Sequence, residues 1–190
     1  MDETTDRART IGWFHQQCIE LWPWAIENDG LVLLNANDKL EQSLAAKMER
    51  WRDPQAEADY EEARLSFEIE RFHFISTIGE AAVRLKWACA TYPELEPHLQ
   101  KAAHLFTEGR ELRNMTVHVD EYFEGRGHQQ SRFERSDVIQ GVTADASSTV
   151  INEHGLWLGG RFNVQIAISE ARALQVICQG LIATGPRIPS

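Results

Sequence analysis

The stretch from Glu111 to Tyr122 contains the residues best suited to chemistry. It reads Glu-Leu-Arg-Asn-Met-Thr-Val-His-Val-Asp-Glu-Tyr and has a strongly helical pattern. On an α-helix, Asn114 and His118 are four residues apart and share a face, and Arg113 lies about 100° around the axis, within reach of the same pocket. An imidazole, a fixed cation and an amide then converge on one spot. Such a group can move a proton and stabilise a phosphorane-like charge without a metal.

No other group of residues in the sequence combines chemistry and spacing as well. Glu70 and His73 have the i, i+3 spacing of a carboxylate-bridged bundle site, but such a site needs a second copy of the motif. Gly159-Gly160 reads as a hairpin turn, because no helix start with Lys-Ser/Thr follows it. The other histidines considered are too scattered for a metal site: His15, His73, His98, His104 and His154. The sequence therefore predicts neither a metal nor a cofactor.

Charge and composition limit the choice of function. The chain of 190 residues is 43% hydrophobic, as expected of one globular domain, and its formal net charge is −10. This acidity argues against broad, non-specific binding of nucleic acid. In residues 101–136, however, six basic side chains balance six acidic ones, and three of the seven histidines lie there. If the protein contacts a phosphate backbone, we expect this neutral segment to do so.

The sequence also indicates location and redox state. The N-terminus is acidic and lacks the basic-then-apolar pattern of a signal peptide, and no apolar run approaches the roughly 18 residues of a membrane span. We therefore expect a cytoplasmic protein without membrane contact. The three cysteines are far apart and form no CxxC pair, so we expect reduced thiols in the core: Cys18, Cys89 and Cys178.

The spacing of apolar residues predicts helices for the first two thirds of the chain. Asn28-Asp-Gly30 is expected to end the first helix, and residues 31–34 form an apolar connector to the second. Asn37 or Asp38 is a suitable N-cap for that second helix. The expected helices before residue 126 span about 11–28, 37–51, 55–91 and 97–125.

Beyond Gly127 the pattern changes to β-branched and turn residues. Short strands are expected at about 148–151, 156–158 and 162–164. A final helix follows over about 165–183. The fold class is therefore mainly α, a four- to five-helix bundle with a small β-hairpin or meander before the C-terminal helix. We expect residues 1–126 to form the bundle, and residues 127–190 to add the strands and the last helix to the same domain.

The arrangement of Arg113, Asn114 and His118 resembles the signature of the HEPN superfamily. In that all-α family, an Arg followed by a polar residue precedes a His by four to six residues on a late helix. Here four residues separate Arg113 from His118. The setting is also similar, with two long antiparallel helices and the motif on the second. The resemblance covers roughly residues 8–126.

The resemblance implies metal-independent cleavage of RNA by a homodimer, in which two copies of the motif meet across a two-fold axis. His118 would act as general base or acid toward the ribose 2′-OH and the leaving oxygen. Arg113 would hold the scissile phosphate, and Asn114 would orient the pair. Cleavage would leave a cyclic phosphate and would require RNA. Toxin-type members are usually accompanied by a neutralising partner protein, so the resemblance implies such a partner as well.

Two features of the sequence differ from an active toxin of this family. A toxin branch has a Tyr two residues after the His, whereas this chain has Asp120 there and Tyr122 two residues further on. In addition, Asp120, Glu121 and Glu124 surround the motif with negative charge, which repels a phosphate.

These features leave a second interpretation open, that of a catalytically inactive helical module which binds a partner protein or a nucleotide. The strand edges expected around Val150 and Trp157 would serve as its docking sites. Arg113 would then form salt bridges on the helix surface, and His118 would be an ordinary half-buried histidine. An endoribonuclease and a binding module are both compatible with the sequence.

Overall fold

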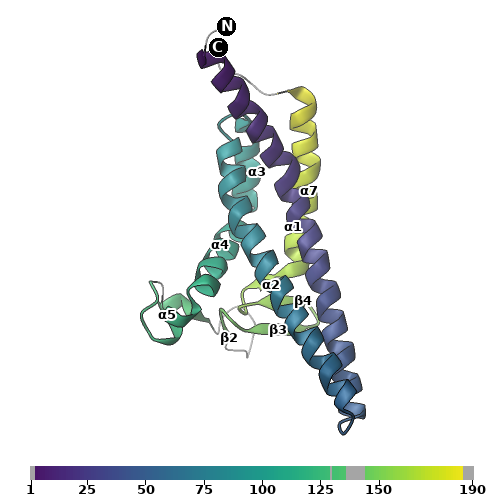
Figure 1. Ribbon diagram of the computed structural model, residues 1–190. Coiled ribbons are helices and arrows are strands. Elements are labelled where there is room, and N and C mark those ends of the chain that lie inside the picture. Colours follow the sequence, from purple (N-terminus) through teal and green to yellow (C-terminus); the bar gives the residue numbers. More distant parts are fainter. Residues whose placement is uncertain (1–2, 129, 136–143, 186–190) are drawn as a thin grey trace.

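The computed structural model describes residues 3–128, 130–135 and 144–185, so the segment predicted for 127–190 lies partly outside it. Most of the described residues are helical, which confirms the mainly α fold class. The body of the described structure consists of α1 (Glu3–Glu49), α2 (Pro54–Ala88), α4 (Ala103–Val117) and α7 (Val164–Thr184). Helix α2 packs against α1 and α4, and α7 lies along α1 (Figure 1).

The N-terminal helix is continuous, so the prediction of two helices joined by a connector at residues 31–34 is wrong. The buried face of α1 continues through Gly30, Leu33 and Asn37. Gly30 does not end the helix but lies where α7 packs against α1. A Cβ at this position would lie 2.6 Å from Cγ1 of Ile168. The absence of a side chain at Gly30 therefore permits the close approach of the two helices.

The predicted third helix is confirmed as α2. It begins at Pro54, a favourable first residue because it has no N–H to leave unpaired. The carboxylate of Asp53 caps the helix by accepting a hydrogen bond from the Gln55 N–H at 3.0 Å. The helix ends at Ala88, a few residues before the expected position.

The predicted fourth helix, at about 97–125, is wrong as a single element. A short 3-10 turn, α3, α4 and α5 take its place, and the backbone departs from helical geometry at Ala102 and at His118. At His118 the φ and ψ angles are −114° and 32°. The bounds of the shorter elements are Pro93–Leu95 for the 3-10 turn, Glu96–Lys101 for α3 and Val119–Phe123 for α5.

The predicted meander is confirmed as an antiparallel sheet with the order β3-β4-β5. Its strands are β3 (Thr149–Asn152), β4 (Gly155–Leu158) and β5 (Phe162–Asn163). Gly159 and Gly160 form the turn between β4 and β5, and both have positive φ angles, which glycine adopts readily. Trp157 lies on the middle strand, opposite Val150, so the expected free edge at Trp157 is wrong. A second, two-stranded ladder pairs β1 (Glu134–Arg135) with β2 (Ala144–Asp145).

The predicted C-terminal helix is confirmed as α7. Its N-cap is Asn163, whose side-chain oxygen accepts a hydrogen bond from the Ile166 N–H at 2.9 Å. Ala167, Ala171 and Leu174 place one face of this helix in the core. By length and composition alone, this helix of 21 residues, with a mean hydropathy of 1.3 over 18 of them, would also suffice to cross a membrane. The absence of membrane contact stays a prediction.

Candidate functional site

The residues of the predicted motif lie at the end of α4. Arg113 and Asn114 belong to its last turns, and His118 is the residue at which α4 ends and α5 begins. The His118 N–H donates to the Asn114 carbonyl at 3.2 Å, while the His118 carbonyl accepts from the Tyr122 N–H at 3.3 Å. His118 therefore keeps a helical relation to Asn114 although the expected continuous helix is broken there.

Arg113 lies on the side of α4 that faces α2. Its aliphatic carbons pack beside Gly79, where a Cβ would lie 3.0 Å from Arg113 Cγ. The guanidinium Nη1 donates to Asn114 Oδ1 at 3.3 Å. Within the described part of the chain, no carboxylate lies within 4.0 Å of this guanidinium. The surface salt bridges expected for an inactive module are therefore not formed by Arg113 among these residues.

Asn114 and His118 line an open hollow of about 320 Å³, together with Glu121, Tyr122 and His128. The side chain of His118 is 55% exposed, and its Nδ1 lies 3.3 Å from Glu121 Oε1. Arg113 is not part of the lining and is connected to the hollow through its hydrogen bond to Asn114. The structure thus brings Asn114 and His118 together directly and places the cation at their side.

His128 is a residue of this hollow that the sequence does not single out. It follows the turn after α5, and Gln130 holds this turn by donating from Nε2 to the Tyr122 carbonyl at 2.9 Å. Because His128 is ten residues from His118, no helical spacing relates the two. The signal available in the sequence was the concentration of histidines in the neutral segment 101–136.

The acidic residues around the motif are partly neutralised. Glu121 lies within ion-pair distance of His118, and Glu124 pairs with Arg126. Asp120 is exposed to solvent. Arg126 therefore offsets the charge of Glu124, whereas Asp120 keeps its negative charge and Glu121 is offset only when His118 is protonated.

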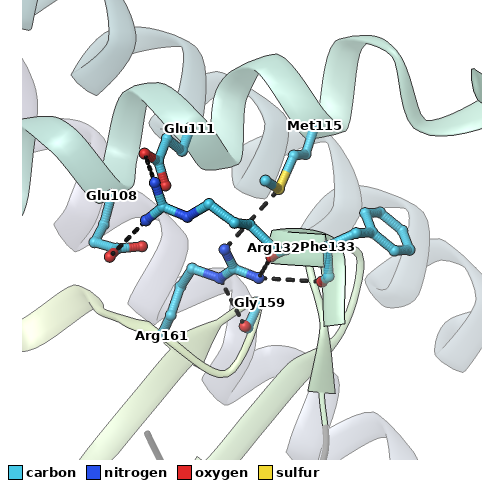
Figure 2. Close-up of polar contacts among 7 residues, drawn as sticks. All are labelled: Glu108, Glu111, Met115, Arg132, Phe133, Gly159 and Arg161. Carbon is cyan, nitrogen blue, oxygen red and sulfur yellow. Dashed lines mark hydrogen bonds and ion pairs between the residues drawn. The ribbon is translucent and has the colours of Figure 1, made fainter. Parts of the chain in front are cut away.

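A second polar cluster lies on another part of α4, and the sequence pattern does not reveal it. Glu108 and Glu111 are buried, with exposed fractions of 6% and 8%, and both pair with Arg132 (Figure 2). The two glutamates are three residues apart and thus share a face of the helix. We refer to Glu108 and Glu111 as the α4 carboxylate pair.

Arg161 lies beside this pair and is only 1% exposed. Its Nη2 donates to the Phe133 carbonyl at 3.1 Å, and its Nε donates to the Gly159 carbonyl at 3.3 Å. Figure 2 shows the guanidinium between the turn that follows β4 and the short helix α6 (Gln130–Phe133), close to Met115 of α4. Buried charges of this kind require such partners. Arg161 therefore joins three separate elements and has a structural role.

Other groups offer less chemistry. Glu70 and His73 form an ion pair at 3.6 Å on α2. Among the residues that the structure describes, no group of three or more His, Cys, Asp or Glu side chains could hold a metal ion. All three cysteines are free, and burial raises the pKa of Cys89 and of Cys178 to about 12, so these thiols are poor nucleophiles.

Comparisons of the chain with protein-family models, curated proteins and solved structures give no match. The resemblance to the HEPN superfamily therefore stays a prediction. The function is therefore inferred from the hollow at the α4–α5 junction and the residues around it.

Proposed function

We propose that this protein is a HEPN-like, metal-independent endoribonuclease that cleaves RNA by attack of a ribose 2′-OH on the adjacent phosphate. The proposal depends on one observation, that His118 and His128 line the same open hollow. The reaction needs a base to remove the 2′-OH proton and an acid to protonate the leaving 5′ oxygen. Two imidazoles can supply both functions, because this side chain exchanges protons near neutral pH.

In this mechanism His118 is the general base and His128 is the general acid. The carboxylate of Glu121 lies beside Nδ1 of His118, which leaves Nε2 as the nitrogen that exchanges a proton with the substrate. The 2′ oxygen bonds to phosphorus as its proton passes to His118. The bond from phosphorus to the 5′ oxygen breaks, and that oxygen takes a proton from His128. The products are a 2′,3′-cyclic phosphate and a free 5′-OH.

Arg113 and Asn114 are assigned to the phosphate. The guanidinium of Arg113 has no carboxylate partner among the described residues, and its bond to Asn114 places a fixed positive charge beside the hollow. A guanidinium can bind two phosphate oxygens at once, which orients the group as well as attracting it. A homodimer and, for a toxin-type role, a neutralising partner protein belong to the same proposal.

RNA cleavage by the purified protein in EDTA tests this function. We expect cyclic phosphate ends on the products and no cleavage of DNA of the same sequence. His118→Ala and His128→Ala should each lower the rate by about 10²–10⁴-fold, the usual contribution of general acid–base catalysis. His154→Ala removes an exposed histidine of the turn between β3 and β4 and should leave the rate unchanged. The proposal fails if the wild type leaves RNA intact, or if these variants all cleave at the wild-type rate.

A second function, binding of a partner protein by an inactive module, is favoured by one observation. β3 is an outer strand that pairs only with β4 within the described structure, and its Ile151 is exposed. An extended peptide could add to this edge through backbone hydrogen bonds. If RNA stays intact, a co-purified protein that protects the β3 amides from hydrogen exchange would support this function.

A further inference from the structure

Helix α2 has an exposed apolar stripe on the side opposite its buried face. Its large side chains are between 37% and 54% exposed and comprise Leu65, Ile69, Phe72, Val83 and Trp87. The steps between them are three, four or eleven residues, so they line up along one side of the helix. Exposed apolar patches of this extent mark interaction sites. We refer to these five residues as the α2 stripe.

We propose that the α2 stripe packs against the same stripe of a second copy of this chain, with the two α2 helices antiparallel about a two-fold axis at Ser76. Leu65 and Trp87 are each eleven residues from Ser76, and Ile69 and Val83 are each seven residues from it. An antiparallel pair therefore places Leu65 against Trp87 of the second copy, and Ile69 against Val83. The small side chain of Ser76 permits close approach where the helices cross.

The distribution of charge along α2 favours the antiparallel direction. Residues 54–71 include six acidic and two basic side chains, whereas residues 72–88 include one acidic and two basic. An antiparallel pair sets a half of net charge −4 against a half of net charge +1. A parallel pair would set the two halves of charge −4 against each other, which is repulsive.

The stripe supplies a large part of the surface that a stable dimer needs. A half-exposed side chain of this size offers roughly 80 Å². Five of them offer roughly 400 Å², about half of the roughly 800 Å² that each partner contributes to a standard interface. Phe14 of α1, which lies beside Arg84 of α2, extends the apolar surface at one end.

The pairing would also complete the site, and this part of the inference rests on the proposed function. Arg113 packs beside Gly79, which is three residues from Ser76, or about 4.5 Å along the helix axis. Along the direction of α2, the two-fold axis therefore lies within about one helical turn of the point where Arg113 of each copy packs. One RNA strand can then meet the Arg113 guanidinium groups of both copies.

Disulfide cross-linking on α2 tests the pairing. Ser76→Cys on the axis should give a covalent dimer on mild oxidation, because facing residues of packed helices lie within the roughly 7 Å between Cα atoms that a disulfide allows. The matched control Ser66→Cys lies ten residues from the axis, so its two copies would be about 30 Å apart and should not cross-link. The wild type controls for Cys18, Cys89 and Cys178. Absence of the Ser76→Cys dimer, or equal cross-linking at position 66, would overturn the proposal.

The mass of the protein in solution gives an independent test. The wild type should be a dimer, and Ile69→Glu should be a monomer with an unchanged circular dichroism spectrum. Val176→Glu alters an exposed apolar residue of α7 and should stay dimeric. A monomeric wild type, or a dimeric Ile69→Glu, would refute the pairing. A cross-linked dimer that leaves RNA intact would refute the proposed function alone, whereas full RNA cleavage by monomeric Ile69→Glu would refute the shared site.

Discussion

Replacement of Gly30 by alanine tests how α7 is held against α1. The new Cβ would lie 2.6 Å from Cγ1 and 3.0 Å from Cδ1 of Ile168, and 3.1 Å from Cε2 of Phe74. Ile168 must therefore move, and Phe74, which is 0% exposed, leaves little room for it. We expect an overpacking cost of about 2–3 kcal/mol. The higher helix propensity of alanine offsets about 1 kcal/mol, so the net destabilisation is about 1–2 kcal/mol.

Gly12 provides a matched control in the same helix. A Cβ at Gly12 would meet no other atom within 4 Å. Gly12→Ala should therefore stabilise the protein by about 0.5–1 kcal/mol through helix propensity alone. Urea denaturation followed by circular dichroism measures both changes as shifts of the midpoint at constant slope.

A double substitution separates the contact from other effects. In an Ile168→Ala background the atoms that a Cβ at position 30 would meet most closely are gone, so Gly30→Ala should be neutral or stabilising. The change of sign between the two backgrounds measures the coupling between α1 and α7. If Gly30→Ala stabilises the wild type as much as Gly12→Ala does, the two helices do not meet at Gly30 and the reasoning is refuted.

Two further predictions concern buried polar groups. Arg132→Ala removes the guanidinium that pairs with both members of the α4 carboxylate pair and should cost about 2–3 kcal/mol, less than the loss of a wholly buried partner, because the Arg132 side chain is 42% exposed. Arg126→Ala removes an exposed ion pair and should cost less than about 1 kcal/mol in the same denaturation assay; equal costs would contradict this. Burial lowers the pKa of His15, which lies 2.7 Å from Thr91 Oγ1, so the unfolded chain binds the proton more readily. The free energy of unfolding should therefore decrease as the pH drops below 6.5, the ordinary pKa of histidine. Denaturation measured across this pH range tests the prediction. If the decrease is equally steep in His15→Gln, His15 is not its cause.

The helices that the sequence predicted well have local signals at their ends. Asp53 and Pro54 mark the start of α2, and Asn163 marks the start of α7. Gly30 is ambiguous, because a glycine can end a helix or allow close packing of a second helix. Its partner Ile168 is far away in the sequence, so no local pattern could decide between these roles.

The candidate site could be predicted only where it depends on local spacing. Asn114 and His118 meet because they are four residues apart in a helical segment, and that relation persists although the helix breaks at His118. No Gly or Pro lies next to His118, so the sequence does not indicate the break in the helix there. His128 reaches the hollow through a turn whose path depends on tertiary contacts, so residue spacing could not place it there.

The α4 carboxylate pair and the hollow are parts of one arrangement. Glu108 and Glu111 bind Arg132, which draws the chain after α5 back along α4, and Arg161 ties the same segment to the turn after β4. His128 lies between α5 and this anchored segment. Its place in the hollow that His118 also lines therefore depends on ion pairs on α4 that precede the motif. Two adjacent parts of one helix thus have separate tasks, since the buried carboxylates hold the segment after α5 while Asn114 and His118, which follow them, line the hollow.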